Sequence, residues 1–337
     1  MSDMKTIIGV VADGKSLSEQ EAAEAFDIIM SGGATDIQIG AFLVALRVRG
    51  ETIEEITGAA RTMRAKATGV QAPAGAIDIV GTGGDAKGTY NISTCATLVA
   101  AGAGAIVAKH GSKAVSSKSG ASDVLEALGV NLTIPPQKVS ECINAANVGF
   151  MFAPAHHSAM KHVMPVRAHL ATRTIFNLLG PLTNPAAVKN QLMGVYSKDW
   201  VEPLAQVLKR LGSDHVWVVH GSDGMDELTT TGASHVAELK DGVIKEFSIT
   251  PEDAGLAQAS PDDLTGGDAR ENASAILDVL SGKQGPFRDI VLLNTGAALI
   301  VAGKAQNIRE GVEQAAKSID TGAAKTALDK LVETSNS

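Results

Sequence analysis

Two short loops of this sequence carry residue types that can hold a strongly anionic ligand. The first loop, Gly81-Thr82-Gly83-Gly84-Asp85, follows an apolar run from Ile77 to Val80 that predicts a short buried strand. Glycine tolerates positive φ and leaves no side chain between backbone and ligand, so this loop can present N–H groups to an anion. Asn91, Ser93 and Thr94 follow, and Ser93 opens a predicted helix whose N-terminus suits a phosphate. The first loop therefore predicts a phosphate-binding turn.

The second loop adds positive charge. A second apolar strand is predicted from Ala105 to Ala108 and ends at Lys109-His110-Gly111, before a segment from Ser112 to Ser119 that is rich in lysine and serine. Ligands of open α/β sheets bind at the carboxyl ends of the strands, and we expect both loops to lie there, on adjacent strands. The lysines are then candidates to neutralise a pyrophosphate, and a solvated basic loop is the alternative.

Neither loop matches a common nucleotide-binding motif. No Gly-Lys-Ser/Thr closes the first loop as in a Walker A sequence, and GTGGDAKG does not have the GxGxxG spacing of a dinucleotide fingerprint. A tight turn that needs glycine is the plainer interpretation of the first loop alone, and the second loop makes it less favoured. His156, His157 and His162 lack i,i+4 ligand spacing, so zinc is not predicted.

A distant pair of acids is the candidate metal site. Asp226 and Glu227 end a glycine-containing segment, 221–227, that follows a strand predicted from His215 to His220. Adjacent carboxylates on an irregular loop can both reach Mg²⁺, which takes a few carboxylates together with phosphate oxygens. An exposed acidic turn is the alternative, since surface acids are common.

Composition favours a protein of the reducing cytosol with a substantial core. The chain has 337 residues, 45% hydrophobic and 20% charged, which is enough for two domains or one large one. A net charge of −8 and an aromatic content of 3% argue against a nucleic-acid-binding surface. The two cysteines, Cys95 and Cys142, predict neither a disulfide framework nor a metal cluster and fit a reducing compartment. Neither a signal peptide nor an apolar stretch of membrane-spanning length is found, so no membrane partner is expected.

The first 70 residues are predicted to be helical. Three capping patterns precede apolar runs: Ser18 with Glu21, Thr35 with Gln38, and Thr52 with Glu55. The middle helix, IQIGAFLVALRVRG, is apolar over most of its surface and is either buried or half of an interface. So small a helical unit has little core of its own, and we expect it to pack on a partner subunit.

Beyond Pro73 strand and helix patterns alternate, which predicts an α/β fold. One long helix is expected from Ser158 to Leu179, returning to the helical unit. Arg167 and Arg173 lie six residues apart on it, so at most one of them is expected to face a given site. Asp241-Gly242 between two apolar segments predicts a β-hairpin.

Six motifs occur in one order along the chain: GTGGD, NIST, KHG…SSKSG…DVLEALG, RTIFNLLGPLTNP, GMDELT and GGDARENA. Together they resemble the anthranilate phosphoribosyltransferases of the tryptophan pathway, and the resemblance covers essentially the whole chain. It implies a small all-helical domain plus a larger α/β domain with a central, mostly parallel sheet flanked by helices. Residues 1–70, joined by part of about 165–190, would form the dimerising helical domain, and 71–164 with 191–337 the phosphoribosyl-pyrophosphate-binding domain.

The resemblance also implies a reaction and its residues. A homodimer would transfer phosphoribose from phosphoribosyl pyrophosphate to the amine of anthranilate with the help of Mg²⁺, giving N-(5-phosphoribosyl)anthranilate and pyrophosphate. The positions that match donor-binding residues are Gly81, Gly84, Asp85, Thr89, Asn91, Ile92, Ser93, Thr94, Lys109, Lys113, Ser116, Ser117 and Ala121. Those that match anthranilate-binding residues are Gly81, His110, Ser112 and Arg167. Those that match Mg²⁺ positions are Ser93, Asp226 and Glu227.

The chemistry so implied is stabilisation of a leaving group. Breaking the donor's C1–O bond builds negative charge on pyrophosphate, which N–H groups, lysines and Mg²⁺ can stabilise. The aromatic amine of anthranilate is uncharged at neutral pH, so positioning suffices to activate it and no general base is assigned.

The chain departs from the family at one place and leaves two other functions open. The family usually has KHGNR, whereas this chain has Lys109-His110-Gly111-Ser112-Lys113. Ser112 is shorter than asparagine with fewer donors, and Lys113 lacks the planar fork of arginine, so the affinity for the acceptor is the property affected. The open alternatives are a pyrimidine nucleoside phosphorylase, which shares the general fold, and a non-catalytic relative that binds nucleic acid.

Overall fold

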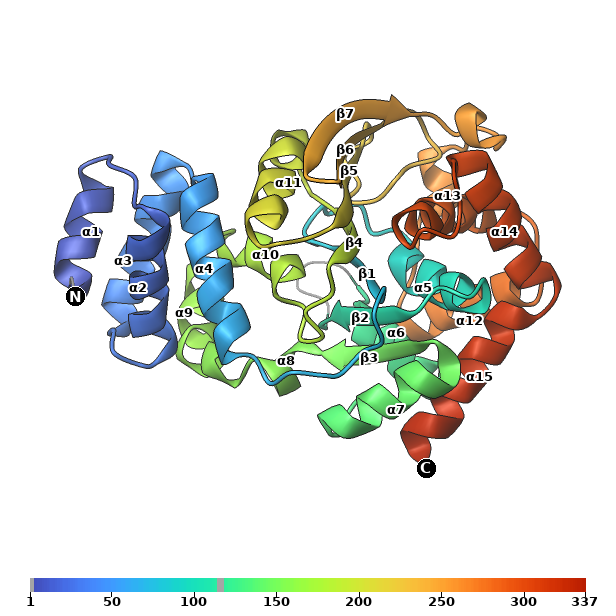
Figure 1. The fold of residues 1–337 in the computed structure, drawn as a ribbon, viewed down its shortest axis with the longest axis horizontal. Helices are drawn as coiled ribbons and strands as arrows, with labels where there is room; N and C mark the ends of the chain where they lie inside the picture. The colour runs from blue at the N-terminus through green and yellow to red at the C-terminus, as the bar shows by residue number, and fades with distance from the viewer. Residues whose placement is uncertain (1–2, 114–117) are drawn as a thin grey trace.

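The computed structural model describes residues 3–113 and 118–337. Its N-terminal helices form a bundle at one side of the molecule, drawn in blue in Figure 1. They are α1 (Met4–Ala12), α2 (Glu19–Met30), α3 (Asp36–Arg49) and α4 (Ile53–Lys66). The last three begin at the predicted capping patterns. The side chains of Ser18, Thr35 and Thr52 each accept a hydrogen bond from the backbone N–H three residues on, and their own backbone N–H groups donate to the side chain of that same residue. That prediction is confirmed.

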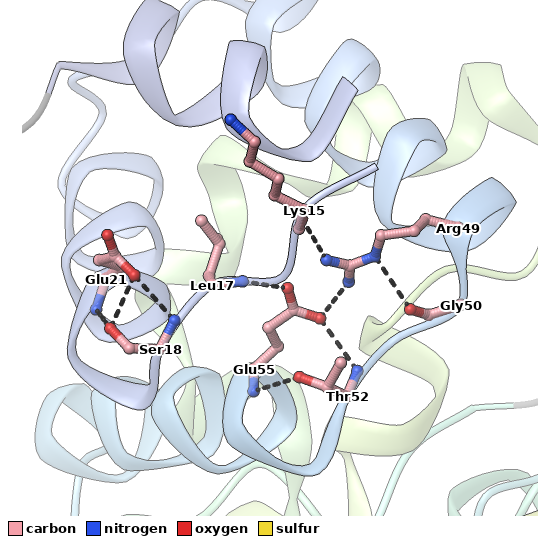
Figure 2. A network of polar contacts seen from close by, with 8 residues as sticks. All are labelled: Lys15, Leu17, Ser18, Glu21, Arg49, Gly50, Thr52 and Glu55. Atoms are coloured by element: carbon pink, nitrogen blue, oxygen red, sulfur yellow. Dashed lines mark hydrogen bonds and ion pairs between the residues drawn. The ribbon is translucent and has the colours of Figure 1, made fainter. Parts of the chain in front are cut away.

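A buried carboxylate, Glu55, ties three segments of the bundle together (Figure 2). It accepts hydrogen bonds from the backbone N–H groups of Leu17 and Thr52, each 2.9 Å long, and forms an ion pair with Arg49. Arg49 in turn donates to the carbonyl oxygen of Lys15 at 2.7 Å. Because both carboxylate oxygens have partners, the buried charge is tolerated and fixes the α1–α2 and α3–α4 connections to the start of α4.

In the part of the chain that the structure describes, seven strands form the central sheet. They are β1 (Ile77–Gly81), β2 (Val107–Gly111), β3 (Val148–Phe152), β4 (Asn190–Gly194), β5 (His215–Gly221), β6 (Ser234–Lys240) and β7 (Val243–Ile249). They lie in the order β3-β2-β1-β4-β5-β6-β7, the first five parallel and the last two antiparallel. The predictions of a mostly parallel sheet and of the hairpin at Asp241-Gly242 are confirmed.

Helices cover both faces of this sheet (Figure 1). The α-helices after the bundle are α5 (Ile92–Gly102), α6 (Ala121–Ala127), α7 (Pro136–Ala146), α8 (Ala153–His156), α9 (Met164–Leu170), α10 (Phe176–Leu179), α11 (Val201–Arg210), α12 (Ala269–Leu280), α13 (Pro286–Val301), α14 (Ile308–Asp320) and α15 (Ala323–Asn336). The short 3₁₀ segments are η1 (Ser158–His162), η2 (Pro181–Thr183), η3 (Lys198–Trp200), η4 (Glu252–Ala254) and η5 (Pro261–Leu264). The helices α5 and α12 to α15 lie on one side, and α11 and the bundle on the other.

Side chains of the strands alternate between two cores. Leu192 of β4 and Trp217 of β5 pack into the core that contains α5 and α13. Their neighbours Met193 and Val218 pack into the core that contains α11 and the bundle. This period of two is that of an extended strand, and burial on both faces is typical of a parallel sheet. The bundle and the sheet therefore share one continuous core.

The prediction of one long helix from Ser158 to Leu179 is wrong. Pro165 lies in the first turn of α9, and Ala171 ends that helix with a φ of 46°, in the left-handed region. The segment is thereby divided into η1, α9 and α10. Arg173 consequently lies in the irregular stretch after α9, and not on a helix shared with Arg167.

Two boundaries near the glycine loop also differ from the prediction. The strand expected at 105–108 runs instead as β2 from Val107 to Gly111, so Lys109 and His110 belong to the strand itself. The helix expected to open at Ser93 begins one residue earlier, at Ile92, after Asn91. No helix within residues 3–113 and 118–337 is long and apolar enough to span a membrane.

Candidate active site

The two predicted loops lie side by side. β1 pairs in parallel with β2, so the glycine loop after β1 and the residues at the end of β2 meet at one edge of the sheet. Lys109 joins them, because its Nζ donates to the carbonyl oxygen of Ile79 at 2.5 Å and to Oγ of Ser93 at 3.3 Å. The expectation that the loops follow adjacent strands is confirmed.

The distant acidic pair lies against the same loop. After β5 the chain turns back, and the Asp226 carboxylate accepts a hydrogen bond of 2.6 Å from the N–H of Gly83. A Cβ at Gly81 would lie 2.2 Å from the same carboxylate, and one at Gly194 would lie 1.6 Å from the Asp226 backbone oxygen. Glycine at these two strand ends is therefore what allows the acidic turn to approach the glycine loop.

Burial shifts the pKa values of the charged residues that meet here, Asp226, Glu227 and Lys109. Burial raises the pKa of Asp226 to about 7, helped by the charge of Asp85, and raises the pKa of Glu227 to about 8, helped by the charge of Asp226. Burial lowers the pKa of Lys109, while the neighbouring carboxylates of Asp78, Glu227 and Asp226 act in the opposite direction. The negative charge of the pair is thus incompletely balanced by the protein, which is the electrostatic environment that favours a bound cation.

Mg²⁺ fits these donors. Among the described residues no group of three or more histidine, cysteine or acidic side chains forms a ready-made metal cage. Mg²⁺ commonly uses one or two carboxylates and completes its shell with water and substrate phosphate. Asp226 and Glu227 could supply those carboxylates. Burial is the main cause of the raised pKa of Glu227, and a hydrogen bond from the Ser93 backbone N–H, which favours the ionised form, partly opposes that rise.

Two residues that were not predicted for the site, Asp78 and Asn184, hold the β2 backbone on either side of Lys109. Asp78, fully buried in β1, accepts hydrogen bonds from the His110 N–H at 3.1 Å and from Nδ2 of Asn184 at 2.7 Å. Asn184 also donates to the carbonyl oxygen of Ala108 at 2.9 Å. Burial raises the pKa of Asp78 to about 6, and the charge of Lys109 opposes that rise. The sequence signal that could have identified Asp78 is an acidic residue within the otherwise apolar strand sequence IDIV.

The start of α5 is connected to the later GGDARENA segment. Asn91 Oδ1 accepts a hydrogen bond of 2.8 Å from Nδ2 of Asn272, and Thr89 forms an isolated antiparallel bridge with Thr265. The side chains of Ile92 and Thr94 are buried. The Ile92 N–H already donates to the Tyr90 carbonyl oxygen at 2.8 Å, so of these two residues it is Thr94 whose backbone N–H, in the first turn of α5, could meet a ligand.

The lysine-rich loop is only partly described. Ser112 and Lys113 are exposed at the end of β2, and Ala121 opens α6. The predicted donor residues Ser116 and Ser117 lie outside the described residues.

The predicted acceptor residues come from separate elements: Gly81 ends β1, His110 lies in β2, Ser112 follows β2, and Arg167 lies in α9. His110 of β2 contacts His157, with 3.3 Å between their Nε2 atoms, and burial lowers the pKa of His110 to about 3 and of His157 to about 4. Both imidazoles are therefore neutral at physiological pH. Arg167 of α9 lies over the ring of Phe176, 5.6 Å from its centroid, and burial lowers its pKa.

The arginine that reaches the glycine loop is Arg173. Its Nη2 donates to the carbonyl oxygen of Gly84, and its guanidinium stacks on Tyr196 at 4.3 Å from the ring centroid. The spacing of Arg167 and Arg173 allowed at most one of them to face a given site, and the family resemblance assigned Arg167 to the acceptor. The contact of Arg173 with the glycine loop was not predicted, because the end of α9 at Ala171 was not foreseen.

A separate hollow of about 600 Å³ lies toward the amino ends of β4 and β5. It is lined by Trp217, Phe247 and Glu238, whose carboxylate bonds to Nε1 of Trp217 and Nε2 of His215, each at 2.9 Å. None of the residues predicted for the site lines this hollow. Because ligands of parallel sheets bind at the carboxyl ends of the strands, the converged loops make the better candidate site.

Comparison with known proteins agrees with this geometry. Two family profiles match: "Glycosyl transferase family, helical bundle domain" over residues 5–67 and "Glycosyl transferase family, a/b domain" over residues 74–325. An anthranilate phosphoribosyltransferase from Rhodopseudomonas palustris is 61% identical over 332 residues, covering 98% of each chain. A solved anthranilate phosphoribosyltransferase from Thermus thermophilus superposes with a TM-score of 0.93 at 43% identity, covering 98% of this chain and 99% of that one. The enzyme from Saccharomyces cerevisiae, solved in complex with PRPP and Mg, superposes with a TM-score of 0.91 at 30% identity, covering 99% and 98%.

Proposed function

The chain belongs to the anthranilate phosphoribosyltransferases of the glycosyl transferase family, and on that basis we propose which of its residues carry the reaction. The reaction transfers phosphoribose from phosphoribosyl pyrophosphate to the amine of anthranilate, in tryptophan biosynthesis, with Mg²⁺ as cofactor. The observation that carries our assignment is the convergence of the glycine loop, Lys109 and Asp226 at the carboxyl ends of neighbouring strands.

The donor site consists of the glycine loop, the start of α5 and the end of β2. We assign to it Gly81, Gly84, Asp85, Thr89, Asn91, Ile92, Ser93, Thr94, Lys109, Lys113, Ser116, Ser117 and Ala121. As the C1–O bond breaks, negative charge builds on the pyrophosphate, and preorganised N–H groups together with the Lys109 ammonium stabilise it. Bound Mg²⁺ supplies further positive charge to the diphosphate oxygens, and Ser93, Asp226 and Glu227 would hold it.

The acceptor site lies beside the donor loop. We assign to it Gly81, His110, Ser112 and Arg167, with the Arg167 guanidinium meeting the carboxylate of anthranilate. Because the aromatic amine is uncharged, holding it against C1 suffices, and no general base is assigned. His110 would contact the acceptor as a neutral imidazole, since burial lowers its pKa to about 3 and leaves it without charge near neutral pH.

Loss of anthranilate fluorescence tests this function directly. Fluorescence should fall when the enzyme, phosphoribosyl pyrophosphate and Mg²⁺ are mixed with anthranilate, and should persist when any one of them is omitted. Persistent fluorescence in the complete mixture, together with phosphate-dependent cleavage of a pyrimidine nucleoside, would assign the chain to the phosphorylases instead.

Ser112→Asn restores the usual family residue and should lower the KM for anthranilate or leave it unchanged. Asparagine adds an amide with two donors where serine has one hydroxyl, so it offers more hydrogen bonds to the acceptor. The measurement is steady-state kinetics at saturating donor, with Ser281→Asn, at an exposed serine after α12, as the matched control. A large rise in KM for Ser112→Asn alone would mean that the acceptor is held differently here.

We further propose that residues 1–70, with part of about 165–190, form a dimerising domain, and that 71–164 with 191–337 bind the donor. Supporting this, Ile37 and Val48 of α3 are 85% and 81% exposed in the single chain, which is unusual for large apolar side chains. Val163 and Val166, on either side of the start of α9, pack into the core of the bundle. An enzyme of this kind would work in the reducing cytoplasm, and Cys95 and Cys142 are both free and buried.

Val48→Glu should convert a homodimer into a monomer. A charge placed in an apolar interface loses hydration without gaining a partner, which opposes association. Sedimentation at micromolar concentration should give a dimer for the wild type and a monomer for the variant. Val243→Glu, at an exposed valine of β7, should remain dimeric. A monomeric wild type would contradict the proposal.

A further inference from the structure

Arg173 contacts the glycine loop at the peptide group between Gly84 and Asp85, whose orientation sets the direction of the Asp85 N–H. Its Nη2 donates to the carbonyl oxygen of Gly84. Because the peptide group is planar and trans, fixing that carbonyl also fixes the N–H of Asp85, which points the opposite way across the same plane. Gly83 and Gly84 both have positive φ, 66° and 77°, so the loop has the backbone freedom that such an anchor removes.

The loop is anchored at three successive residues, and Arg173 provides the third anchor. The Thr82 N–H donates to the Gly194 carbonyl oxygen at 3.0 Å, and the Thr82 hydroxyl accepts from the Tyr196 N–H at 3.1 Å. The Gly83 N–H donates to Asp226. Removing the guanidinium would therefore release the part of the loop that leads into Asp85, while the first two anchors remain.

Arg173 is itself held from two sides. Its guanidinium stacks on the Tyr196 ring, and a flat cation gains both electrostatic and packing energy there. Its backbone carbonyl accepts a hydrogen bond of 2.6 Å from Nη1 of Arg47, which also donates to the Thr172 hydroxyl. Arg47 lies on α3, the helix whose exposed apolar residues we assign to the dimer interface. A continuous set of contacts thus runs from α3 through Arg173 to the glycine loop.

We propose that Arg173 is a positioning residue for phosphoribosyl transfer: it holds the Gly84 peptide so that the loop N–H groups are preset for the diphosphate, and Arg47 holds Arg173 in place from α3. The proposal rests on the donor-binding function assigned to the glycine loop. It gives the bundle a role in the reaction besides association, because the position of α3 is transmitted to the loop that binds the leaving group.

Arg173→Ala is the main test. The KM for phosphoribosyl pyrophosphate should rise at least about tenfold, with a smaller change in the KM for anthranilate. Hydrogen exchange of the 82–88 segment should accelerate, and added guanidinium should restore part of kcat/KM. Arg173→Lys should be intermediate, because an ammonium keeps the charge but not the planar stack on Tyr196.

Two companion variants sharpen the test. Arg47→Ala leaves the contact between Arg173 and Gly84 in place. It should therefore raise the KM for phosphoribosyl pyrophosphate and accelerate hydrogen exchange of the 82–88 segment, but both by less than Arg173→Ala does. Arg309→Ala removes an arginine that likewise donates to backbone carbonyls, those of Glu252 and Asp253, and should behave as wild type. Melting temperatures of all variants separate these effects from unfolding.

Three results would overturn the proposal. One is a folded Arg173→Ala enzyme with wild-type donor KM. Another is a raised donor KM without faster loop exchange, which would make Arg173 a direct substrate contact. The third is wild-type loop exchange in Arg47→Ala. Failure of the donor-binding function would look different, because the wild-type enzyme itself would not consume anthranilate.

Discussion

A variant carrying Asp226→Asn and Glu227→Gln is expected to turn over at least about tenfold more slowly than the wild type when Mg²⁺ is limiting. The two amides keep the size of the side chains and remove the charges that would hold the ion beside the diphosphate. The measurement is the initial rate of anthranilate consumption across a Mg²⁺ titration, where the deficit should shrink as Mg²⁺ rises.

We do not expect the double variant to be less stable than the wild type, so slower turnover would not come from unfolding. Burial raises the pKa of Asp226 to about 7 and of Glu227 to about 8, which means that the folded protein disfavours both negative charges. Neutral amides should therefore melt at the wild-type temperature or above it when Mg²⁺ is absent. Glu252→Gln with Asp253→Asn changes an exposed adjacent pair in η4 and serves as the matched control. Wild-type turnover in the first double variant would remove Asp226 and Glu227 from the mechanism.

Lys109→Met should be the most damaging single substitution for both stability and activity. Lys109 is only 2% exposed, and its positive charge opposes the rise that burial causes in the pKa of Asp78. Without it Asp78 becomes a buried charge lacking its cation, a change that costs about 3–5 kcal/mol of unfolding free energy. Loss of a positive group preset for the leaving group should lower kcat/KM about a hundredfold or more.

A double-mutant cycle separates the interaction between Lys109 and Asp78 from general damage to the core. Urea unfolding of Lys109→Met, Asp78→Asn and the double variant should show that the double variant loses less stability than the sum of the single variants. Lys189→Met removes one partner of an exposed pair with Asp214, 3.8 Å apart, and should cost less than about 1 kcal/mol. Additive losses at Lys109 and Asp78 would show that the two charges do not support each other.

Local patterns predicted the parts of the fold that depend on local chemistry. The caps at Ser18, Thr35 and Thr52 were visible because a hydroxyl followed three residues later by an acid or amide satisfies helix N-terminal N–H groups without help from elsewhere. The glycine loop and the Asp226-Glu227 turn were likewise recognisable from residue type and from their place after strands. Their meeting at one sheet edge followed from the parallel topology that the alternating pattern indicated.

What the sequence did not reveal depends on packing between distant segments. The left-handed residue at Ala171 breaks an otherwise helical pattern, and alanine gives no local signal for that conformation. Arg173 could not be placed without this break. Asp78 and Asn184 were missed for a related reason, because a buried acid becomes interpretable only when its partners, 32 and 106 residues away, are known.

We propose that the glycine loop, Lys109 and the acidic pair act together, through Mg²⁺, on a single diphosphate. Calorimetric titration of phosphoribosyl pyrophosphate into the wild type and into the variant with Asp226→Asn and Glu227→Gln, at a series of Mg²⁺ concentrations, tests it most directly. We expect Mg²⁺ to strengthen donor binding to the wild type. The variant should lose this Mg²⁺-dependent part while keeping weaker, Mg²⁺-independent binding. Equal Mg²⁺ dependence in the two proteins would contradict it.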